Sequence, residues 1–500
     1  MINLRKNINK TMMQYFEWYL PSDQNLWKNV AKDANYLENI GITGIWLPPA
    51  YKGAGGKDDT GYGVYDLYDL GEFDQKGSIP TKYGTKEEYL NAIRLLKGNS
   101  IEVYADIVLN HRLGADETEE VLAIEDDPSN RNIDISSALP IQAWTKYNFP
   151  GRGNKYSSFR WNWTHFHGVD WDEKLKKSSI YKFYGKHWDE EVDKENGNFD
   201  YLMGADVDLN NVDVTEELKR WGKWYLNLTN VDGFRLDAVK HIRADFFEDW
   251  LEEMRDATEK ELFTVGEYWS TNVETLNQYL KETNYSMSLF DVPLHYNLFN
   301  ASNCCGHYDM RTILDNTLVK SHPDLAVTFV DNHDTQPGQS LNSWVQDWFK
   351  PQAYALILLR RDGYPCIFYG DYYGIPHNKI PAKKDILEIL IEARKYFAYG
   401  IQRDYFDDSN IIGWTREGDY EHPDSGMAVI MTDNAGGCKQ MNVGTRLANS
   451  ILYDCTGNMK ETVYVDQDGN GIFYCNGGSV SVWIKKDNIY LKKEEEYCKK

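Results

Sequence analysis

The chain has 500 residues, which is longer than one ordinary domain but within the length of an α/β barrel that carries insertions. Its formal net charge of -23 argues against binding to the phosphates of nucleic acids, because proteins that do so concentrate lysine and arginine on one face. No apolar stretch is long enough to span a bilayer. We therefore expect a soluble globular protein with neither a nucleic acid nor a membrane as its partner.

Aromatic residues are abundant, with 35 Tyr, 16 Trp and 19 Phe. Much of this must form the core, but the stretch "FRWNWTHFHGVDW" (159–171) mixes aromatic with polar residues and has neither helix nor strand period. Sugar rings have apolar faces that stack on aromatic rings and hydroxyl edges that need hydrogen-bonding partners. Such a cluster suits a carbohydrate groove, although aromatic-rich loops are also common by chance.

The cysteines and the N-terminus indicate a reducing compartment. Seven cysteines are an odd number, and they include no CxxC pair, so they suggest no disulfide framework. Near the N-terminus, Glu17 interrupts a short apolar run before it could serve as the core of a signal peptide. We expect a cytoplasmic protein, or a secreted one whose leader has been removed.

In chain order, eight β-branched or aromatic runs alternate with helical stretches. Helical period is clear in "TEELKRWGKWYLNL" (215–228) and "FFEDWLEEMRDAT" (246–258), where apolar residues recur at i, i+3 and i+4. Eight strands that alternate with helices predict an α/β fold, a (β/α)8 TIM barrel. The predicted strands lie in residues 12–19, 41–49, 101–110, 231–239, 262–269, 287–295, 325–334 and 364–371.

Two segments interrupt this alternation. Residues 110–212, after the third strand, are rich in Asp, Asn, Gly and aromatics, and loops of this length are usually functional insertions. From residue 401 the pattern becomes short alternating runs ("IIGWTR", "MAVIMTD", "ETVYVD", "SVSVWIKK") with Gly and Asn turns. We predict a barrel over 1–109 and 213–400, an inserted irregular β-rich domain over 110–212, and a C-terminal antiparallel β-sandwich over 401–500.

Polar clusters follow four of the predicted strands. The carboxyl ends of barrel strands form the active site, whereas the other rim supports the fold. Any one carboxylate there could instead cap the next helix or pair with an arginine. Four clusters on one rim favour an active site because the barrel makes them converge. The clusters are Asp106, Asn110 and His111; Arg235 and Asp237; Glu267; and Asp331, His333 and Asp334.

Carboxyl groups that converge in this way suit the hydrolysis of a glycosidic bond, which needs one carboxylic acid and one carboxylate. On a strand, Arg235 and Asp237 share a face, and the arginine would lower the pKa of this aspartate and keep it ionised, as a nucleophile requires. Glu267 is flanked by Tyr268 and Trp269, and such a partly apolar setting would raise its pKa and suit the acid.

The motifs "DIVLNH", "GFRLDAVKH", "GEYW" and "FVDNHD" resemble the four conserved regions of the α-amylase family, glycoside hydrolase family 13, in the family's order. Further motifs, "MQYFEWY", "PPAYKG", "GYGVYDLYDLGEF", "YDMR", "DNHDTQPGQSL" and "GWTREGD", resemble the liquefying bacterial α-amylases in particular. The resemblance covers nearly the whole chain. With the cysteine usage, it indicates an intracellular member.

The resemblance implies a role for each matching residue. Asp237 would be the nucleophile, Glu267 the general acid/base, and Asp334 the carboxylate that holds the sugar's hydroxyls and its distorted ring. Arg235 would position Asp237. Five residues would bind substrate: His111 and His333 at the cleavage point, Tyr62 as a stacking platform, Trp269 on the acceptor side, and Lys240 at the next sugar on the leaving-group side.

A calcium site is implied as well. Calcium prefers oxygen ligands from carboxylates, amides and carbonyls, and Asn110, Asp200, Asp206 and the carbonyl of His241 match the family's structural site. Liquefying relatives often bind further metals, and Asp189, Asp208, Gly306, Tyr308 and Asp433 fit those sites. However, His167, Asn210, Ser409 and Asn410 stand where other ligands are expected. We predict one Ca²⁺ and do not predict the further calcium or sodium ions.

The leading hypothesis is a monomeric, retaining, endo-acting hydrolase of α-1,4-glucosidic bonds in starch, glycogen or maltodextrins. Two alternatives stay open within the clan, an exo-acting maltooligosaccharide-forming amylase and a transglycosylase. A barrel that only binds carbohydrate is a different class, and it would have no need for three carboxylates, Arg235 and two histidines together. Natural substrate and product length depend on loop shapes that the sequence does not display.

Overall fold

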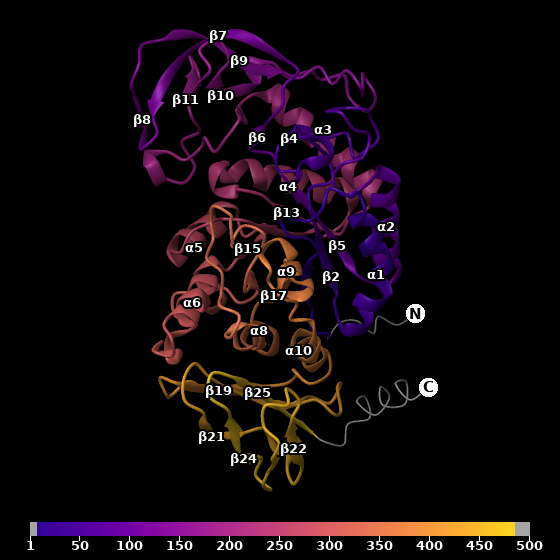
Figure 1. Ribbon diagram of the computed structural model, residues 1–500, viewed down its shortest axis with the longest axis vertical. Coiled ribbons are helices and arrows are strands. Elements are labelled where there is room, and N and C mark those ends of the chain that lie inside the picture. The colour runs from indigo at the N-terminus through magenta and orange to yellow at the C-terminus, as the bar shows by residue number, and fades with distance from the viewer. Residues whose placement is uncertain (1–7, 486–500) are drawn as a thin grey trace.

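The computed structural model describes residues 8–485 (Figure 1). Within them, eight parallel strands close into a barrel in the order β1-β17-β16-β15-β14-β13-β5-β2. Each strand lies inside one of the eight predicted runs, so the predicted barrel is confirmed. The strands are β1 (Met12–Gln14), β2 (Gly44–Leu47), β5 (Glu102–Ile107), β13 (Gly233–Leu236), β14 (Phe263–Gly266), β15 (Ser288–Phe290), β16 (Ala326–Phe329) and β17 (Tyr364–Phe368).

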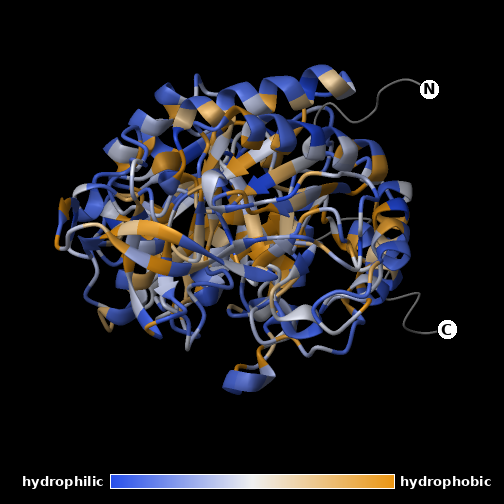
Figure 2. Cartoon of the chain, turned by 90° about the horizontal axis from the view of Figure 1, so that it is seen from above, coloured by the Kyte–Doolittle hydropathy of each residue, from blue (hydrophilic) through white to orange (hydrophobic). Residues whose placement is uncertain are grey.

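Helices surround the barrel with their polar faces outward, and Figure 2 shows the hydrophobic strands at the centre. The two predicted helical stretches lie within α3 and α4, whose buried residues recur at helical spacing. The helices are α1 (Leu26–Ile40), α2 (Lys86–Gly98), α3 (Val212–Thr229), α4 (Ala244–Thr258), α5 (Val273–Glu282), α6 (Val292–Asn303), α7 (Leu318–Ser321), α8 (Lys350–Leu359), α9 (Tyr369–Tyr373) and α10 (Lys384–Tyr396).

The sixth barrel strand is shorter than predicted. Residues 287–295 were expected as one strand, but β15 ends at Phe290 and α6 begins at Val292. Asp291 caps this helix by accepting a hydrogen bond from the backbone N–H of Leu294 at 3.0 Å, and Pro293 lies in the first turn. The alternation of apolar residues continues through the junction, which is why the sequence pattern alone extends the strand.

The fourth strand also ends earlier than predicted, and this affects the site. β13 stops at Leu236, and Ala238 has a left-handed backbone with φ of 52°. Val239–His241 form a 3-10 turn. Asp237 therefore follows the last residue of the strand but still meets Arg235 at 2.6 Å, and Lys240 and His241 lie in the turn that comes next.

Between α2 and α3, after the third barrel strand β5, the chain forms an antiparallel sheet without an α-helix in these described residues. Its order is β6-β12-β10-β11-β7-β8, with β9 paired to β7, and β6 and β12 lie nearest the barrel. The strands are β6 (His111–Arg112), β7 (Glu117–Asp127), β8 (Asn130–Asp134), β9 (Leu139–Lys146), β10 (Phe166–Asp172), β11 (Lys177–Phe183) and β12 (Ala205–Val207). A hairpin of β3 (Lys52–Gly53) and β4 (Val64–Asp66) lies beside the barrel.

The last described part of the chain is an antiparallel β domain, as predicted. Figure 1 shows three tiers, with the inserted sheet and this domain at opposite ends of the barrel. The main sheet has the order β18-β19-β20-β25-β22-β23, and β21 pairs with β24. The strands are β18 (Gln402–Tyr405), β19 (Ile411–Arg416), β20 (Met427–Thr432), β21 (Gly437–Asn442), β22 (Ile451–Asp454), β23 (Thr462–Tyr464), β24 (Asn470–Cys475) and β25 (Val480–Lys485).

Two further expectations concern cysteines and membranes. The six cysteines in residues 8–485 are free thiols, and Cys498 lies outside the described residues. None of the helices in the described part of the chain combines the length and the apolar character that crossing a bilayer requires.

Close packing between β13 and β14 gives a test of the fold. A Cβ added at Gly233 would lie 1.9 Å from the carbonyl oxygen of Phe263, whereas one added at Gly98, at the exposed end of α2, would meet nothing within 4 Å. We expect Gly233→Ala to destabilise the protein by about 2–3 kcal/mol because the strands must separate. Gly98→Ala is the matched control and should change stability by less than about 1 kcal/mol. Denaturant unfolding followed by circular dichroism measures both, and equal effects would contradict the packing described.

Candidate active site

One buried arginine joins three carboxyl groups at the carboxyl ends of the barrel strands. Arg235, on β13, is fully buried. Its Nη1 lies 2.8 Å from Asp106 Oδ1 and 2.6 Å from Asp237 Oδ1, and its Nη2 lies 2.9 Å from Glu267 Oε2. The guanidinium therefore fixes carboxyl groups from three adjacent strand ends, those of β5, β13 and β14.

Backbone hydrogen bonds hold two of these residues beyond the ends of their strands. Asp237 N–H donates to the Ile107 carbonyl at 2.9 Å, and Glu267 N–H donates to the Leu236 carbonyl at 2.9 Å. The left-handed Ala238 lets its own N–H reach the Glu267 carboxylate at 3.2 Å. The ladder of backbone hydrogen bonds thus continues for one residue beyond β13 and β14, so that the carboxyl groups of Asp237 and Glu267 lie close together.

Burial raises the pKa of two of the carboxyl groups at this site. It raises the pKa of Glu267 to about 8, and Arg235 partly offsets the rise while Asp237 and Asp334 add to it. Burial also raises the pKa of Asp334 to about 7. Asp237 is in contact with the guanidinium at 2.6 Å. The arrangement can supply a protonated acid, Glu267, beside a second carboxyl group at neutral pH.

Aromatic rings stack beside these groups. The rings of Tyr62 and His333 are nearly parallel, with centroids 5.0 Å apart and an interplanar angle of 10°, and Trp18 stacks on Tyr62 at 5.9 Å. The Tyr62 hydroxyl donates to Asp106 Oδ2 at 2.7 Å, and its carbonyl accepts from His111 Nε2 at 2.9 Å. The same buried Asp106 therefore anchors both the aromatic platform and the arginine.

His333 is held as a neutral ring. Gln14 Nε2 donates to its Nδ1 at 3.0 Å, so that Nε2 carries the hydrogen and lies 3.3 Å from Asp334 Oδ2. Burial lowers the pKa of His333 well below its usual value, and the charge of Arg235 adds to this. A neutral imidazole that presents an N–H can donate to a sugar hydroxyl.

These groups lie in a cleft of about 820 Å³. Arg235 is buried behind Asp237 and Glu267 and is the one predicted catalytic or substrate-binding residue that does not line the cleft. Lys240 pairs with Glu195 at 2.8 Å on one wall of it. The predicted residues that line it are Tyr62, His111, Asp237, Lys240, Glu267, Trp269, His333 and Asp334.

Sequence reasoning missed Gln14 and Trp18 and gave Asp106 no role. Gln14 and Trp18 occur in "MQYFEWY", which served to predict a strand and as a motif of the family resemblance, but neither residue was given a role. Gln14 meets a histidine 319 positions away, a contact that local pattern does not reveal. Asp106 was noted as a strand-end carboxylate, and its complete burial on a parallel-barrel strand is the feature that could have marked it.

The predicted calcium ligands gather where the inserted sheet meets the barrel. Asn110 and Asp206 lie on adjacent segments, since Val207 N–H donates to the Asn110 carbonyl at 3.0 Å. His241 Nδ1 donates to the carbonyl of Phe199, the residue before Asp200, at 2.6 Å. The Asn110 amide nitrogen is buried and has no hydrogen-bond partner among the described residues. Two buried carboxylates, an amide and a carbonyl are ligands that suit calcium, so these residues fit such an ion.

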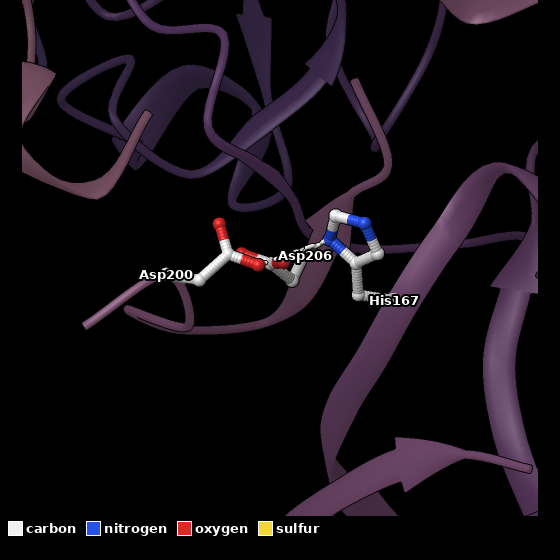
Figure 3. A group of neighbouring side chains, drawn as sticks. All are labelled: His167, Asp200 and Asp206. Carbon is white, nitrogen blue, oxygen red and sulfur yellow. Dashed lines mark hydrogen bonds and ion pairs between the residues drawn. The ribbon is translucent and has the colours of Figure 1, made fainter. Parts of the chain in front are cut away.

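A histidine occupies the rest of this acidic cluster (Figure 3). His167 Nδ1 lies 3.1 Å from Asp200 and 3.0 Å from Asp206, and its Nε2 lies 3.1 Å from Asp208 and 3.9 Å from Asp189. Burial alone would lower the pKa of His167, but hydrogen bonds to three of these aspartates raise it well above its usual value. The ring is therefore positively charged at neutral pH and compensates buried carboxylates.

Other polar side chains contact the remaining carboxylate oxygens of this cluster. Lys186 pairs with Asp208, and Asn210 donates to Asp189 while accepting from Arg243. The residues at 167 and 210, where the family resemblance leads us to expect aspartates, are thus a cation and an amide in contact with this cluster.

At the boundary with the C-terminal domain, several oxygens that a further metal ion would need accept hydrogen bonds, whereas Asp433 Oδ1 is buried without a hydrogen-bond partner among the described residues. Asn410 Oδ1 accepts from Thr432 Oγ1 at 2.7 Å and from Asn434 N–H at 3.0 Å. The Gly306 carbonyl accepts from the Asn434 amide at 2.9 Å. Tyr308 N–H donates to Asp433 at 3.1 Å.

Comparison with known protein families gives two matches. Residues 24–417 match the model described as "Alpha amylase, catalytic domain". Residues 427–484 match the model described as "Alpha-amylase C-terminal". The first match covers more than half of the chain and includes every predicted catalytic, substrate-binding and calcium-binding residue.

Individual relatives are similar over nearly their whole length. An "Alpha-amylase" of Geobacillus stearothermophilus is 60% identical, over 96% of this chain and 87% of the relative. A "Glucan 1,4-alpha-maltohexaosidase" of Bacillus sp. (strain 707) is 55% identical, over 96% and 93%. A "Cytoplasmic alpha-amylase" of Escherichia coli is 44% identical, over 96% and 100%.

The charge on His167 can be tested through stability. His167→Leu leaves buried carboxylates without their cation, and we expect it to lower the free energy of unfolding by about 3 kcal/mol or more. His187→Leu removes an exposed histidine from the same domain and is the matched control. Urea unfolding followed by tryptophan fluorescence, at one calcium concentration, measures the difference. If His167→Leu lowers the free energy of unfolding no more than the control does, a charged His167 imidazole does not stabilise the fold.

Proposed function

The chain belongs to the α-amylase family of retaining glycoside hydrolases, and we propose that it hydrolyses internal α-1,4-glucosidic bonds in starch, glycogen or maltodextrins. The observation that carries the assignment of roles is the buried Arg235, which contacts Asp237 and Glu267 together. Because the guanidinium holds both groups together, we assign one carboxyl group to attack and the other to give up a proton at the same bond.

The first step transfers the sugar to the enzyme. Glu267, with a pKa of about 8, donates its proton to the glycosidic oxygen while Asp237 Oδ attacks the anomeric carbon. The bond to the leaving chain breaks and a covalent glycosyl-enzyme forms. Arg235 contacts Asp237 at 2.6 Å and holds it in position, and Glu267 becomes a carboxylate in this step.

The second step releases the sugar. The Glu267 carboxylate takes a proton from water, the resulting hydroxide equivalent attacks the anomeric carbon, and Asp237 leaves as a carboxylate. Two inversions retain the α configuration. Asp334, His111 and His333 hold the hydroxyls of the reacting sugar in both steps, and hydrogen bonds that strengthen in the transition state lower the barrier.

The flanking sugars are held by aromatic and charged side chains. Tyr62, with Trp18 and His333 stacked beside it, offers a platform for the reacting sugar. Trp269 and Lys240 lie on the wall beyond Glu267, and we assign them to the leaving-group side.

A second candidate function is the release of maltooligosaccharides of fixed length from chain ends. It is favoured by the 55% identical relative that is named glucan 1,4-alpha-maltohexaosidase. Endo attack lowers the viscosity of amylose before reducing sugar accumulates, whereas fixed-length release does the reverse. A time course of products from amylose and maltoheptaose separates the two.

We also propose one structural calcium ion, held by Asn110, Asp200, Asp206 and the His241 carbonyl. When bound, the ion supplies positive charge that joins the inserted sheet to the turn after β13. The protein would act as a monomer. The 44% identical relative named cytoplasmic α-amylase, together with free cysteines, supports a cytoplasmic location and therefore soluble glucans as substrates.

The nucleophile and the stereochemistry can be tested together. We expect Asp237→Asn to lower kcat on maltoheptaose more than about a thousandfold because no covalent intermediate can form. The wild type should release the α-anomer first, as proton NMR of fresh product would show. Full activity in the variant would overturn the nucleophile, and initial release of the β-anomer would overturn retention.

The acid role of Glu267 predicts a pH dependence. The reaction needs the protonated form, so kcat on maltoheptaose should fall as pH rises through about 8. Glu267→Gln should lower kcat/KM strongly on maltoheptaose but much less on maltotriosyl fluoride, because fluoride leaves without a proton and kcat/KM reports the first step, before Glu267 acts as a base. Equal losses on both substrates, or a wild-type rate that falls only above pH 10, would contradict this role.

Calcium should stabilise the folded state by mass action. We expect a chelator to lower the thermal midpoint of the wild type. In Asp200→Asn, the midpoint should be the same with calcium and with chelator. Circular dichroism melts with excess calcium and with chelator measure this difference. An identical midpoint in both conditions for the wild type would mean that the proposed ligands hold no calcium.

A further inference from the structure

A fully buried lysine lies close to the end of β16. Lys350 is the first residue of α8, a largely apolar helix, and none of its side chain lines the catalytic cleft. Burial of an ammonium group is costly, and a cation at the N-terminus of a helix also opposes the helix dipole. The stability of α8 therefore does not explain this residue, and its charged contacts lie outside the helix.

Lys350 joins the segments that follow two adjacent barrel strands. Its Nζ contacts Asp331 Oδ2, after β16, and lies 2.7 Å from Asp371 Oδ1, in α9 after β17. Both aspartates are buried. Attraction to two carboxyl groups offsets the cost of burying the ammonium group only while this geometry is held. The three side chains thus tie the end of β16 to the end of β17.

The same contact closes a loop, residues 331–345, that borders the catalytic cleft. Asp331 at the start of the loop contacts Lys350. At the end of the loop, the Val345 N–H donates to Asp331 Oδ2 at 3.2 Å, and the centroid of the Trp344 ring lies 3.4 Å from Lys350 Nζ. Four residues between these ends line the cleft, and they are His333, Asp334, Ser340 and Leu341.

Hydrogen bonds connect the Asp331 carboxyl group to the backbone of Asp334. Thr335 Oγ1 donates to Asp331 Oδ1 at 2.7 Å and accepts from the Asn332 N–H at 2.9 Å. Asn332 Oδ1 in turn accepts from the Asp334 N–H at 2.8 Å. The position of Asp334 therefore depends on that of Asp331, and Lys350 fixes Asp331.

We propose that Lys350 is a positioning residue for the reaction, which sets the place of Asp334 through Asp331 and Thr335. The inference rests on the proposed function, in which Asp334 holds hydroxyls of the reacting sugar. Because those hydrogen bonds strengthen in the transition state, a displaced Asp334 lowers the rate more than it weakens substrate binding. Lys350 acts through these side chains and does not touch the substrate.

Lys350→Met removes the ammonium group and keeps most of the apolar volume. We expect it to lower kcat about tenfold or more, with KM within about twofold of the wild type, on maltoheptaose and on maltotriosyl fluoride. The loss should appear on both substrates because Asp334 holds the reacting sugar of each. A kcat within about twofold of the wild type on both substrates would overturn the proposal.

Arg360→Met is the matched control. Arg360 follows the other end of α8, is buried, and pairs with Asp404 at 2.6 Å and with Asp362 at 3.6 Å. It is thus a second buried cation with two carboxylates, but it lies before β17, at the opposite rim of the barrel. At a temperature where both variants are folded by circular dichroism, the control should keep kcat within about twofold of the wild type. A loss as large as that of Lys350→Met would overturn the proposal.

Thr335→Val breaks the same connection without a change of charge, so it tests the proposal even if Lys350→Met does not fold. We expect kcat on maltoheptaose to fall about threefold or more, with KM nearly unchanged. The control is Thr328→Val, because Thr328 is buried on β16 and its hydroxyl has no hydrogen-bond partner among residues 8–485. Equal kcat values in the two threonine variants would overturn the proposal.

The combined variant shows whether Lys350 and Thr335 act through one chain of contacts. If they do, Lys350→Met with Thr335→Val should lose about as much kcat as Lys350→Met alone, whereas independent effects would multiply. A multiplied loss would contradict the connection through Asp331. If the wild type itself does not cleave maltoheptaose, it is the proposed function that fails, so the two failures are distinguishable.

Discussion

The contact between one buried guanidinium and three carboxyl groups is the interaction on which the site depends. Removing Arg235, Asp106, Asp237 and Glu267 from water is costly, and the attraction between them offsets that cost only while their geometry is held. The closed barrel supplies this geometry, because its ladder of backbone hydrogen bonds continues past the strand ends to Asp237 and Glu267. Asp106 extends the network to Tyr62, so the sugar platform and the reacting groups share one support.

The inserted domain also buries several carboxylates, but different groups compensate their charge. Four aspartates surround His167, whose ring carries part of the compensating charge, and Lys186 takes another part. Residues 235–241 connect the two centres, since Arg235 lies on β13 and His241 in the 3-10 turn that follows it.

Much of this architecture follows from sequence pattern, and the rest depends on tertiary contacts. The eight barrel strands and the convergence of Asp237, Glu267 and Asp334 on one cleft could be predicted because each acidic motif follows an apolar run, and a parallel barrel must bring such ends together. The end of β13 could not be predicted, because the left-handed backbone conformation of Ala238 depends on tertiary contacts. Gln14 and His333 meet across 319 positions, and Asp106 and Arg235 meet across 129. Neither of these contacts produces a periodic pattern in the sequence.

The most direct test of the central claim is the activity of Arg235→Lys on maltotriosyl fluoride and on maltoheptaose. Lysine keeps the charge but lacks the planar fork that reaches Asp106, Asp237 and Glu267 at once. If the shared guanidinium sets the geometry of both carboxyl groups, kcat should fall about a hundredfold or more on both substrates in protein that is folded by circular dichroism. A kcat within about threefold of the wild type on both would contradict the account.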